Sequence, residues 1–246
     1  MAMPFADSVE LLLCDADGNL FPSEEPAFVA SCGVTNAFLS AIGSDRHFEP
    51  AELRLAATGK NFRATAEELA RDAGATVDPA TLEWWVEEER RQVSAHLGTV
   101  LRPDPSVAEP LARLAERFRL AVVSSSATAR LDVCFHATGL DTLFPRAVRF
   151  SADDSLPQPA SKPDPAVYVF AGERLGVGPE QAIAIEDSLA GVQSAVAAGF
   201  PTVGNVVFVA EDERAERVEV LRSAGAAAIV ESWHELEELL APRVPA

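Results

Sequence analysis

Short apolar runs that stop at polar residues recur along this chain and predict buried strands. The first, VELLLCDAD (9–17), stays largely apolar until it reaches two aspartates, as a strand covered on both faces does. Later runs have the same design, and they span 119–125, 182–187, 201–205 and 226–230; a further strand is expected at 146–150. Each run is therefore predicted to lie inside a sheet.

Helical patterns lie between these strands. They are expected over 105–117, 127–138, 165–175 and 189–198, and the last three are followed by a glycine, which commonly ends a helix. A final helix begins after Ser232, with Glu235 in the spacing of a capping box. Strands that alternate with helices form parallel sheets joined by right-handed crossovers. The predicted fold class is therefore α/β, with a doubly wound, Rossmann-like parallel sheet.

Residues 24–100 interrupt this alternation. Their patterns are helical, at 27–42, 50–57, 61–73 and 79–97, and none predicts a strand. The simplest interpretation is a helical domain at 21–102 inserted after the first strand, which leaves 1–20 and 103–246 as the core. An insertion at the carboxyl end of a strand lies where α/β sheets bind ligands, so the inserted domain is expected to act as a cap.

Composition indicates a globular chain of 246 residues with 48% hydrophobic content and no apolar stretch near the roughly 18 residues that span a bilayer. The first residues lack the features of an export signal, so a cytoplasmic protein is expected. A net charge of −18 argues against nucleic acid or an anionic membrane as a partner, but not against one small anion in a local cationic pocket. The three widely spaced cysteines predict neither disulfides nor a zinc site.

Polar residues follow three of the predicted strands. They are Asp15 and Asp17, the serines 124–126, and the segment Glu186, Asp187 and Ser188. Because the carboxyl ends of parallel strands meet at one edge of a sheet, these side chains are expected to lie together. Lys162, in SKPDP, is expected to join them, and it is one of only two lysines among 20 basic residues.

Four carboxylates cannot all stay ionised at one buried site without a countercharge. Mg²⁺ is suited to this task, since it accepts phosphate oxygens beside one or two carboxylates. Lys162 adds a second positive charge, while Ser124 and the backbone N–H groups after it supply neutral donors. The sequence thus predicts a site for Mg²⁺ and a phosphate group.

Four ordered motifs, DADGN, VVSSS, SKPDP and AIAIEDSLAGV, resemble those of the haloacid dehalogenase-like hydrolase superfamily. Within it the chain is similar to the β-phosphoglucomutase-like phosphatases, which carry a helical cap inserted after the first motif. The resemblance covers the whole core and the position of the cap. It implies a Mg²⁺-dependent phosphatase that acts on a small phosphorylated metabolite, expected to be a sugar phosphate, through an aspartyl-phosphate intermediate.

The resemblance also implies a role for each motif. Asp15 would be the nucleophile, and Asp17 would protonate the leaving alcohol and later activate water. Ser124 and the N–H of Ser125 would hold the transferring phosphoryl group, and Lys162 would neutralise Asp15 and the phosphate. The implied metal ligands are the carboxylates of Asp15, Glu186 and Asp187 and the backbone carbonyl of Asp17.

Departures from the family pattern bear on which reaction is run. Asn19 replaces a frequent Thr, and Pro22 replaces a frequent Asp. The phosphoglucomutases have a histidine near position 27, where this chain has Ala27 and no histidine before His47. Simple hydrolysis is therefore favoured over phosphoryl transfer of the β-phosphoglucomutase type, which is the alternative.

Two alternatives that are not enzymes also remain. A phospho-accepting signalling module would be about half this length and without an inserted cap, and a catalytically silent binding relative would be expected to have lost one of the four motifs. The partner expected is a small phosphorylated substrate. Monomer and homodimer both stay open.

Polar residues with weaker signals lie in the cap and after the second strand. In TGKNFRAT (58–65), one interpretation is a specificity loop that binds the substrate beyond its phosphate, with Gly59, Lys60, Asn61 and Arg63 as candidates; the other is a helix start with solvated charges. For Ser126 and Thr128 the sequence favours a helix N-cap.

Overall fold

The computed structural model describes residues 8–57 and 61–241, and the chain divides into two compact units. The core unit combines the chain up to Pro22 with the chain from Arg102 onward and contains the sheet. The helical unit is Ser23–Leu101. That the helical unit acts as a cap stays a prediction.

Six strands are described in the core unit. They are β1 (Leu11–Cys14), β2 (Arg119–Ser124), β3 (Arg149–Ser151), β4 (Ala182–Glu186), β5 (Thr202–Asn205) and β6 (Ala228–Val230). Every ladder is parallel, and the strand order is β3-β2-β1-β4-β5-β6. β1 lies between β2 and β4, which accounts for its fully apolar sequence. The predicted doubly wound α/β fold is confirmed.

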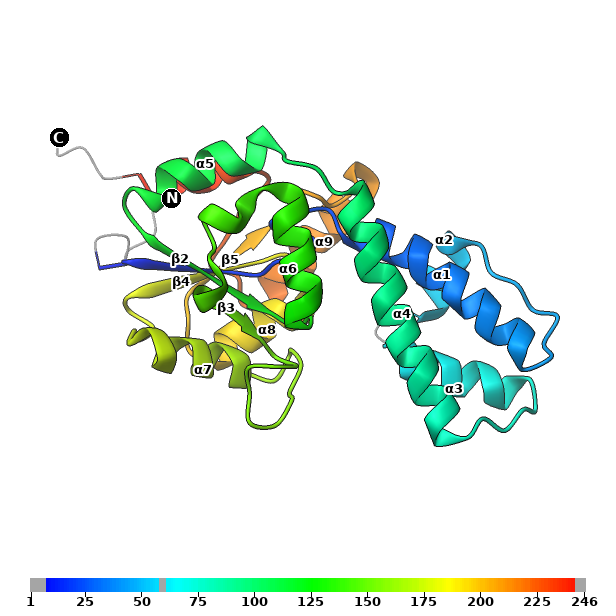
Figure 1. The fold of residues 1–246 in the computed structure, drawn as a ribbon. Helices are drawn as coiled ribbons and strands as arrows, with labels where there is room; N and C mark the ends of the chain where they lie inside the picture. The colour runs from blue at the N-terminus through cyan, green and yellow to red at the C-terminus, as the bar shows by residue number, and fades with distance from the viewer. Residues whose placement is uncertain (1–7, 58–60, 242–246) are drawn as a thin grey trace. The chain divides into compact units, whose positions relative to one another are not determined.

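The helices of the core unit follow the predicted alternation. They are α5 (Pro105–Ala115), α6 (Thr128–Thr138), α7 (Ala166–Leu175), α8 (Leu189–Ala197), α9 (Glu211–Ser223) and α10 (Trp233–Leu239), with short 3₁₀ turns at Leu140–Thr142 and Arg146–Val148. Leu11 and Leu13 of β1 share one apolar cluster with residues of α7 and α8. Figure 1 shows α5 on the upper side of the sheet and α7 on the lower side. Both faces are therefore covered, as the continuous apolar run in β1 predicted.

The helical unit consists, in its described part, of α1 (Glu24–Ala41), α2 (Pro50–Ala57), α3 (Phe62–Asp72) and α4 (Pro79–Val100). All four match predicted helices, and α1 and α4 run a few residues beyond the predicted bounds. Asp78 caps α4 by accepting from the N–H groups of Ala80 and Thr81. The unit has its own apolar core, centred on residues such as Phe38, Leu39 and Leu53.

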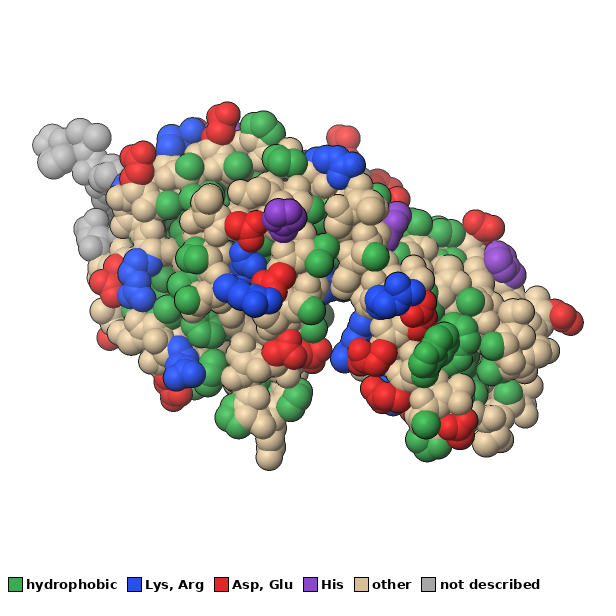
Figure 2. All heavy atoms as spheres, in the orientation of Figure 1, with side chains coloured by type: hydrophobic (Ala, Val, Ile, Leu, Met, Phe, Trp, Pro, Cys, Tyr) green, Lys and Arg blue, Asp and Glu red, His purple; other side chains and the backbone are tan. Residues whose placement is uncertain are grey.

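Within the described residues, no helix combines the length and the apolar character that a bilayer span requires. On the face drawn in Figure 2, basic side chains are interspersed with acidic ones and form no continuous basic surface. That distribution agrees with the net charge of −18.

Candidate active site

Lys162 lies at the centre of the polar edge of the sheet. Its ammonium group donates to Asp15 Oδ1 at 2.5 Å, to Glu186 Oε1 at 2.6 Å and to the carbonyl of Val123 at 2.7 Å. Only 5% of its side chain is exposed, so its three N–H groups all have acceptors inside the protein. One cation, supplied by the loop before α7, thus ties together the ends of β1, β2 and β4.

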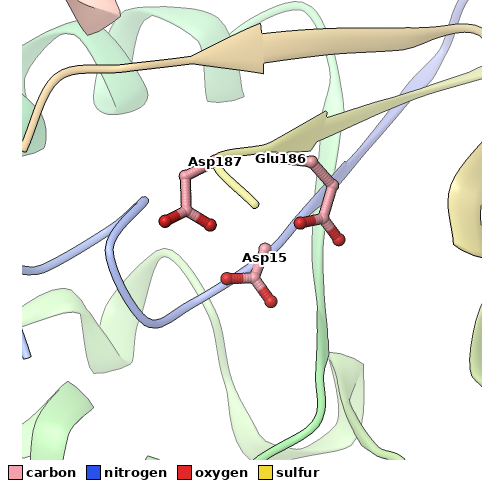
Figure 3. A group of neighbouring side chains, drawn as sticks. All are labelled: Asp15, Glu186 and Asp187. Atoms are coloured by element: carbon pink, nitrogen blue, oxygen red, sulfur yellow. The ribbon is translucent and has the colours of Figure 1, made fainter. Parts of the chain in front are cut away.

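Asp187 adds a third buried carboxylate to those of Asp15 and Glu186 (Figure 3). One oxygen from each of the three lies within 4.8 Å of the others. Since β1 and β4 are neighbours in the sheet, their ends place Asp15 beside the acidic pair. When all three are ionised, the carboxylates outnumber the Lys162 ammonium that contacts two of them, and such a cluster suits a divalent cation.

Burial dominates the electrostatics of this cluster. It raises the pKa of Asp15 to about 8, although the Lys162 ammonium opposes the rise and the charge of Glu186 adds to it. Burial acts to lower the pKa of Lys162, but the two neighbouring carboxylates outweigh it and hold that pKa above its ordinary value. Lys162 therefore stays charged, and a second cation among the carboxylates would relieve their repulsion.

Glu186 is completely buried, and its two oxygens differ in their surroundings. Oε1 accepts from Lys162 and from the Tyr168 hydroxyl, the latter at 2.5 Å. Oε2 has no hydrogen-bond partner among the described residues. An unpartnered oxygen in a cluster of hard oxygen donors fits Mg²⁺, which binds such oxygens.

The glycine in the first turn of α8 makes room for this carboxylate. A Cβ added at Gly191 would come within 1.7 Å of Glu186 Oε2 and 2.2 Å of its carboxyl carbon. Real Cβ atoms do not approach other atoms so closely, so glycine is required here while Glu186 keeps its position. The carboxylate also lies at the positive end of the α8 dipole, which favours its charge.

Asp17 makes contacts apart from this cluster. Its carboxylate accepts from Ser126 Oγ at 2.6 Å and from the Arg130 guanidinium at 2.9 Å. The acidic group that brings Asp15, Glu186 and Asp187 together does not include the Asp17 side chain. Its predicted contribution to the metal is through the backbone carbonyl, and that role stays a prediction.

The serines after β2 lie next to the Lys162 loop. Ser124 is buried, and its Oγ accepts from the N–H of Ser126 at 3.0 Å. Ser125 Oγ accepts from the backbone N–H of Lys162 at 3.3 Å. The second and third motifs are therefore in direct contact.

The prediction of an N-cap at Ser126 and Thr128 is wrong. α6 begins at Thr128, and its flanking residue Ala127 makes no side-chain cap. The N–H of Thr128 is bound instead by Asp154 at 2.6 Å, from the polar loop after β3. The Ser126 hydroxyl donates to Asp17 instead, and the residue that flanks the helix is Ala127.

Two of the four candidate residues of the helical unit, Asn61 and Arg63, have local partners. Asn61 caps α3, with its side chain accepting from the N–H of Ala64 at 2.9 Å. Arg63 pairs with Glu83. Gly59 and Lys60 lie outside the described residues. A helix start is therefore present, and the specificity role of all four residues stays a prediction.

Sequence reasoning missed two residues that orient the predicted catalytic groups, Arg130 and Tyr168. Arg130 stands in the first turn of α6, at the positive end of the helix dipole, where a cation is unfavourable unless it has an anionic partner. Tyr168 is the single tyrosine of the chain and lies in an apolar helix face. Two features of the sequence could have indicated these residues. One is an arginine at an unfavourable helix end, and the other is a single tyrosine in an apolar stretch.

Comparison with known proteins agrees with this geometry. The model of the haloacid dehalogenase-like hydrolases matches residues 9–199, most of the chain. The chain belongs to the haloacid dehalogenase-like hydrolase family. The predicted family and the predicted class of enzyme, a hydrolase, are thereby confirmed.

Individual relatives of this family member match over much of their length. A "Phosphorylated carbohydrates phosphatase" of Thermotoga maritima is 32% identical over 159 residues, which cover 63% of this chain and 68% of the relative. The plasmid-encoded CbbY protein of Cupriavidus necator is 32% identical over 217 residues, covering 83% and 81%. The crystal structure of a HAD family hydrolase from Deinococcus radiodurans, with bound phosphate and sodium, is 25% identical with a TM-score of 0.65 and covers 96% of this chain and 99% of its own.

Proposed function

We propose that this chain is a Mg²⁺-dependent phosphatase that hydrolyses a small sugar phosphate through an aspartyl-phosphate formed on Asp15. The observation that carries the proposal is the buried contact of Lys162 with Asp15 and Glu186, beside Asp187. In their ionised forms the three carboxylates outnumber the Lys162 ammonium, which favours a divalent cation, and the cation in turn favours a phosphate group. Family membership supports the same chemistry.

In the first step, a carboxylate oxygen of Asp15 attacks phosphorus. A bond forms between this oxygen and phosphorus while the bond from phosphorus to the ester oxygen of the substrate breaks. Mg²⁺, held by the carboxylates of Asp15, Glu186 and Asp187 and by the carbonyl of Asp17, would supply positive charge to the phosphoryl oxygens. The Ser124 hydroxyl and the N–H of Ser125 would donate hydrogen bonds to the same group.

Lys162 holds Asp15 in place for this attack. Because all three of its N–H groups already have acceptors, it must exchange one of them to donate to a phosphoryl oxygen. The carbonyl of Val123 is the uncharged acceptor and the one at the longest distance, so it is the contact that exchanges at the lowest cost.

Asp17 is assigned the proton transfers. In the first step it gives a proton to the leaving alkoxide, and in the second it takes a proton from the water that attacks the aspartyl-phosphate. A protonated carboxyl forms no ion pair, so the first step requires Asp17 to release Arg130. The same ion pair suits the second step, in which Asp17 acts as a base.

Hydrolysis is proposed over phosphoryl transfer because of the residue at position 27. The resemblance places a supporting histidine near this position in the phosphoglucomutases, and here Ala27 lies in the first turn of α1. Without that histidine, water is the expected acceptor of the phosphoryl group.

A sugar phosphate is proposed as the substrate because the Thermotoga relative is named for phosphorylated carbohydrates. The helical unit would act as the cap, and the segment with Gly59, Lys60, Asn61 and Arg63 would contact the sugar. Arg63 would then have to share or leave its partner Glu83.

The experiment is phosphate release from an aryl phosphate and from a panel of sugar phosphates, with Mg²⁺ and with a chelator. Asp15→Asn should lower kcat by at least about 1000-fold, since the nucleophile is lost, and the chelator should abolish turnover. Glucose 1-phosphate should release phosphate without net conversion to glucose 6-phosphate. Undiminished turnover in Asp15→Asn contradicts the mechanism, and conversion without phosphate release contradicts the choice of hydrolysis.

Asp104→Asn is the matched control. Asp104 caps α5 by accepting from the N–H of Ser106 at 2.9 Å, and an asparagine oxygen can do the same. The same change of one acid to its amide, away from the site, should leave kcat within about twofold.

A further inference from the structure

Asn19, in the loop after β1, is fully buried and makes hydrogen bonds that the proposed mechanism does not use. Its side-chain Nδ2 donates to the carbonyl of Asp15 at 2.8 Å and to the carbonyl of Ile185 at 3.3 Å. Asp15 is the proposed nucleophile, and Ile185 directly precedes Glu186. One amide group therefore bridges the two chain segments that carry the acidic cluster.

Two further buried side chains hold Asn19 itself. Asn205, at the end of β5, donates from its Nδ2 to Asn19 Oδ1 at 2.9 Å. Trp233, at the start of α10, donates from its indole N–H to the carbonyl of Asn19 at 3.1 Å. Asn19, Asn205 and Trp233 all have 0% exposure. A buried polar network with its donors and acceptors paired is rigid, so the Asn19 amide has little freedom to turn.

Asn19 adds a side-chain bridge where the pairing of β1 with β4 ends, at Cys14 and Ile185. Just beyond this pairing, the N–H of Asp15 donates to the carbonyl of Ile185 at 2.9 Å. The chain then turns back, and the N–H of Leu20 bonds to the carbonyl of Ala16. The Asn19 amide donates to the same Ile185 carbonyl and to the carbonyl of Asp15, so it strengthens the connection between the two strand ends.

We propose that Asn19 is a positioning residue that fixes the spacing between the ends of β1 and β4. It would thereby set the distance from the Asp15 carboxylate to the Glu186 and Asp187 carboxylates. The inference rests on the proposed function for its kinetic consequence, but the predicted effect on cation binding is independent of turnover. It also explains why this chain departs from a threonine at position 19.

A threonine could not make the same set of contacts. Its hydroxyl has one hydrogen to donate, so it cannot bridge the carbonyls of both Asp15 and Ile185. It would also leave the amide of Asn205 without its present acceptor in a fully buried place. Asn19 and Asn205 therefore depend on each other, and a substitution at one position is expected to be tolerated only together with a substitution at the other.

The test compares Asn19→Ala with the full-length wild type at a temperature well below unfolding of either. Displacing the nucleophile should lower kcat about 10- to 100-fold while KM changes less than about threefold, since no substrate contact is removed. Titration calorimetry with Mg²⁺ alone should show a dissociation constant raised by about tenfold, because the ligand oxygens lose their common spacing. A purely structural role would lower Tm and leave both quantities unchanged.

Asn36→Ala is the matched control. Asn36, in α1 of the helical unit, also bridges backbone groups, donating to the carbonyl of Phe48 at 2.9 Å and accepting from the N–H of Phe48 at 2.9 Å. It should lower Tm and leave kcat and the Mg²⁺ dissociation constant within about twofold. A loss of kcat as large in Asn36→Ala as in Asn19→Ala overturns the proposal.

Two further variants decide the matter if Asn19→Ala does not fold. Asn205→Ala keeps both Asn19 donors and removes their support, and Asn19→Thr keeps one donor; both should lower kcat by about three- to tenfold. Wild-type kcat and Mg²⁺ affinity in these variants overturn the proposal. If wild-type protein releases no phosphate, the proposed function fails, while the calorimetric comparison still decides on positioning.

Discussion

Two buried cations in the core unit, Lys162 and Arg149, each lie between a pair of carboxylates, yet their surroundings differ. Their side chains are almost equally buried, at 5% and 3% exposure. Arg149 donates to Asp132 at 2.9 Å, to Asp141 at 2.8 Å and to the carbonyl of Phe144 at 2.8 Å. Each of its three nitrogens therefore donates to an acceptor from the protein.

The balance of charge differs between the cluster around Arg149 and the cluster around Lys162. The arginine cluster contains two guanidinium groups and two carboxylates, since Arg146 also pairs with Asp132, and both aspartates are partly exposed to water. The lysine cluster has three buried carboxylates and one ammonium, and one oxygen of Glu186 lacks a partner among the described residues. In the arginine cluster each charged group has a partner of opposite sign, whereas a buried excess of charge is costly unless a ligand compensates it.

The type of basic side chain also suits each of the two clusters. The planar guanidinium of Arg149 fits two carboxylates at once and stacks on Phe135, with 4.1 Å from its carbon to the ring centre. Lys162 offers a compact point charge that can exchange one acceptor for another. The chain has 20 basic residues and only two lysines, so a lysine at the polar edge of the sheet agrees with the compact charge that the proposed role of Lys162 requires.

Substituting each of the two cations by the other type should give the largest effects, and these should differ between the two clusters. Lys162→Arg places a larger group in a filled site, so kcat should fall by about 100- to 1000-fold. Arg149→Lys should leave kcat within about twofold and lower the free energy of unfolding by about 1–3 kcal/mol, because an acceptor of the fork is left unpaired. Steady-state kinetics and urea unfolding measure the two effects. Full activity in Lys162→Arg would show that the lysine is only structural.

The contact between Gly191 and Glu186 should give the next largest effect. Gly191→Ala drives a methyl group into the carboxylate, so Glu186 must move and kcat should fall by about 10- to 100-fold. Gly33→Ala is the control, since nothing lies within 4 Å of a Cβ there and the residue is inside α1. That variant should gain about 0.5–1 kcal/mol in stability with unchanged kcat. Equal behaviour of the two alanine variants would contradict the assigned role of Gly191.

Removing the Tyr168 hydroxyl should give the smallest effect. Tyr168→Phe keeps the ring and loses one of the two hydrogen bonds to Glu186 Oε1, while Lys162 still holds that oxygen. The loss of a hydrogen bond of about 1 kcal/mol predicts a fall in kcat of about fivefold. A loss as large as that of Lys162→Arg would mean that Tyr168 contacts the reacting groups and does more than support Glu186.

Strand ends were predictable from the sequence because burial on both faces leaves a continuous apolar run, and parallel strands bring their ends to one edge. This reasoning placed Asp15, Lys162, Glu186 and Asp187 together. It could not predict that the Asp17 side chain makes contacts apart from the cluster. Asp15 and Asp17 have one residue between them, and the pattern does not distinguish their directions until the turn after β1 is known.

Contacts between distant segments were beyond the reach of local pattern. The Asp17 partner Arg130 is 113 residues away, and the cap of α6 comes from Asp154, 26 residues after Thr128. The start of a helix indicates that its first N–H groups need an acceptor, but it does not indicate which loop supplies that acceptor. For that reason the wrong residues, Ser126 and Thr128, were predicted to fill the role.

The hydrogen bond from Trp233 to Asn19 spans 214 residues of sequence and has a consequence for the order of folding. β1 is synthesised before both of its neighbours in the sheet, and its partner β4 begins 168 residues after it ends. Closing such long loops is entropically costly and slow, so β1 and its acidic loop must wait for most of the chain. The site therefore assembles late during synthesis, and a nascent chain that ends before α10 lacks the last support of the loop that carries the proposed nucleophile, Asp15.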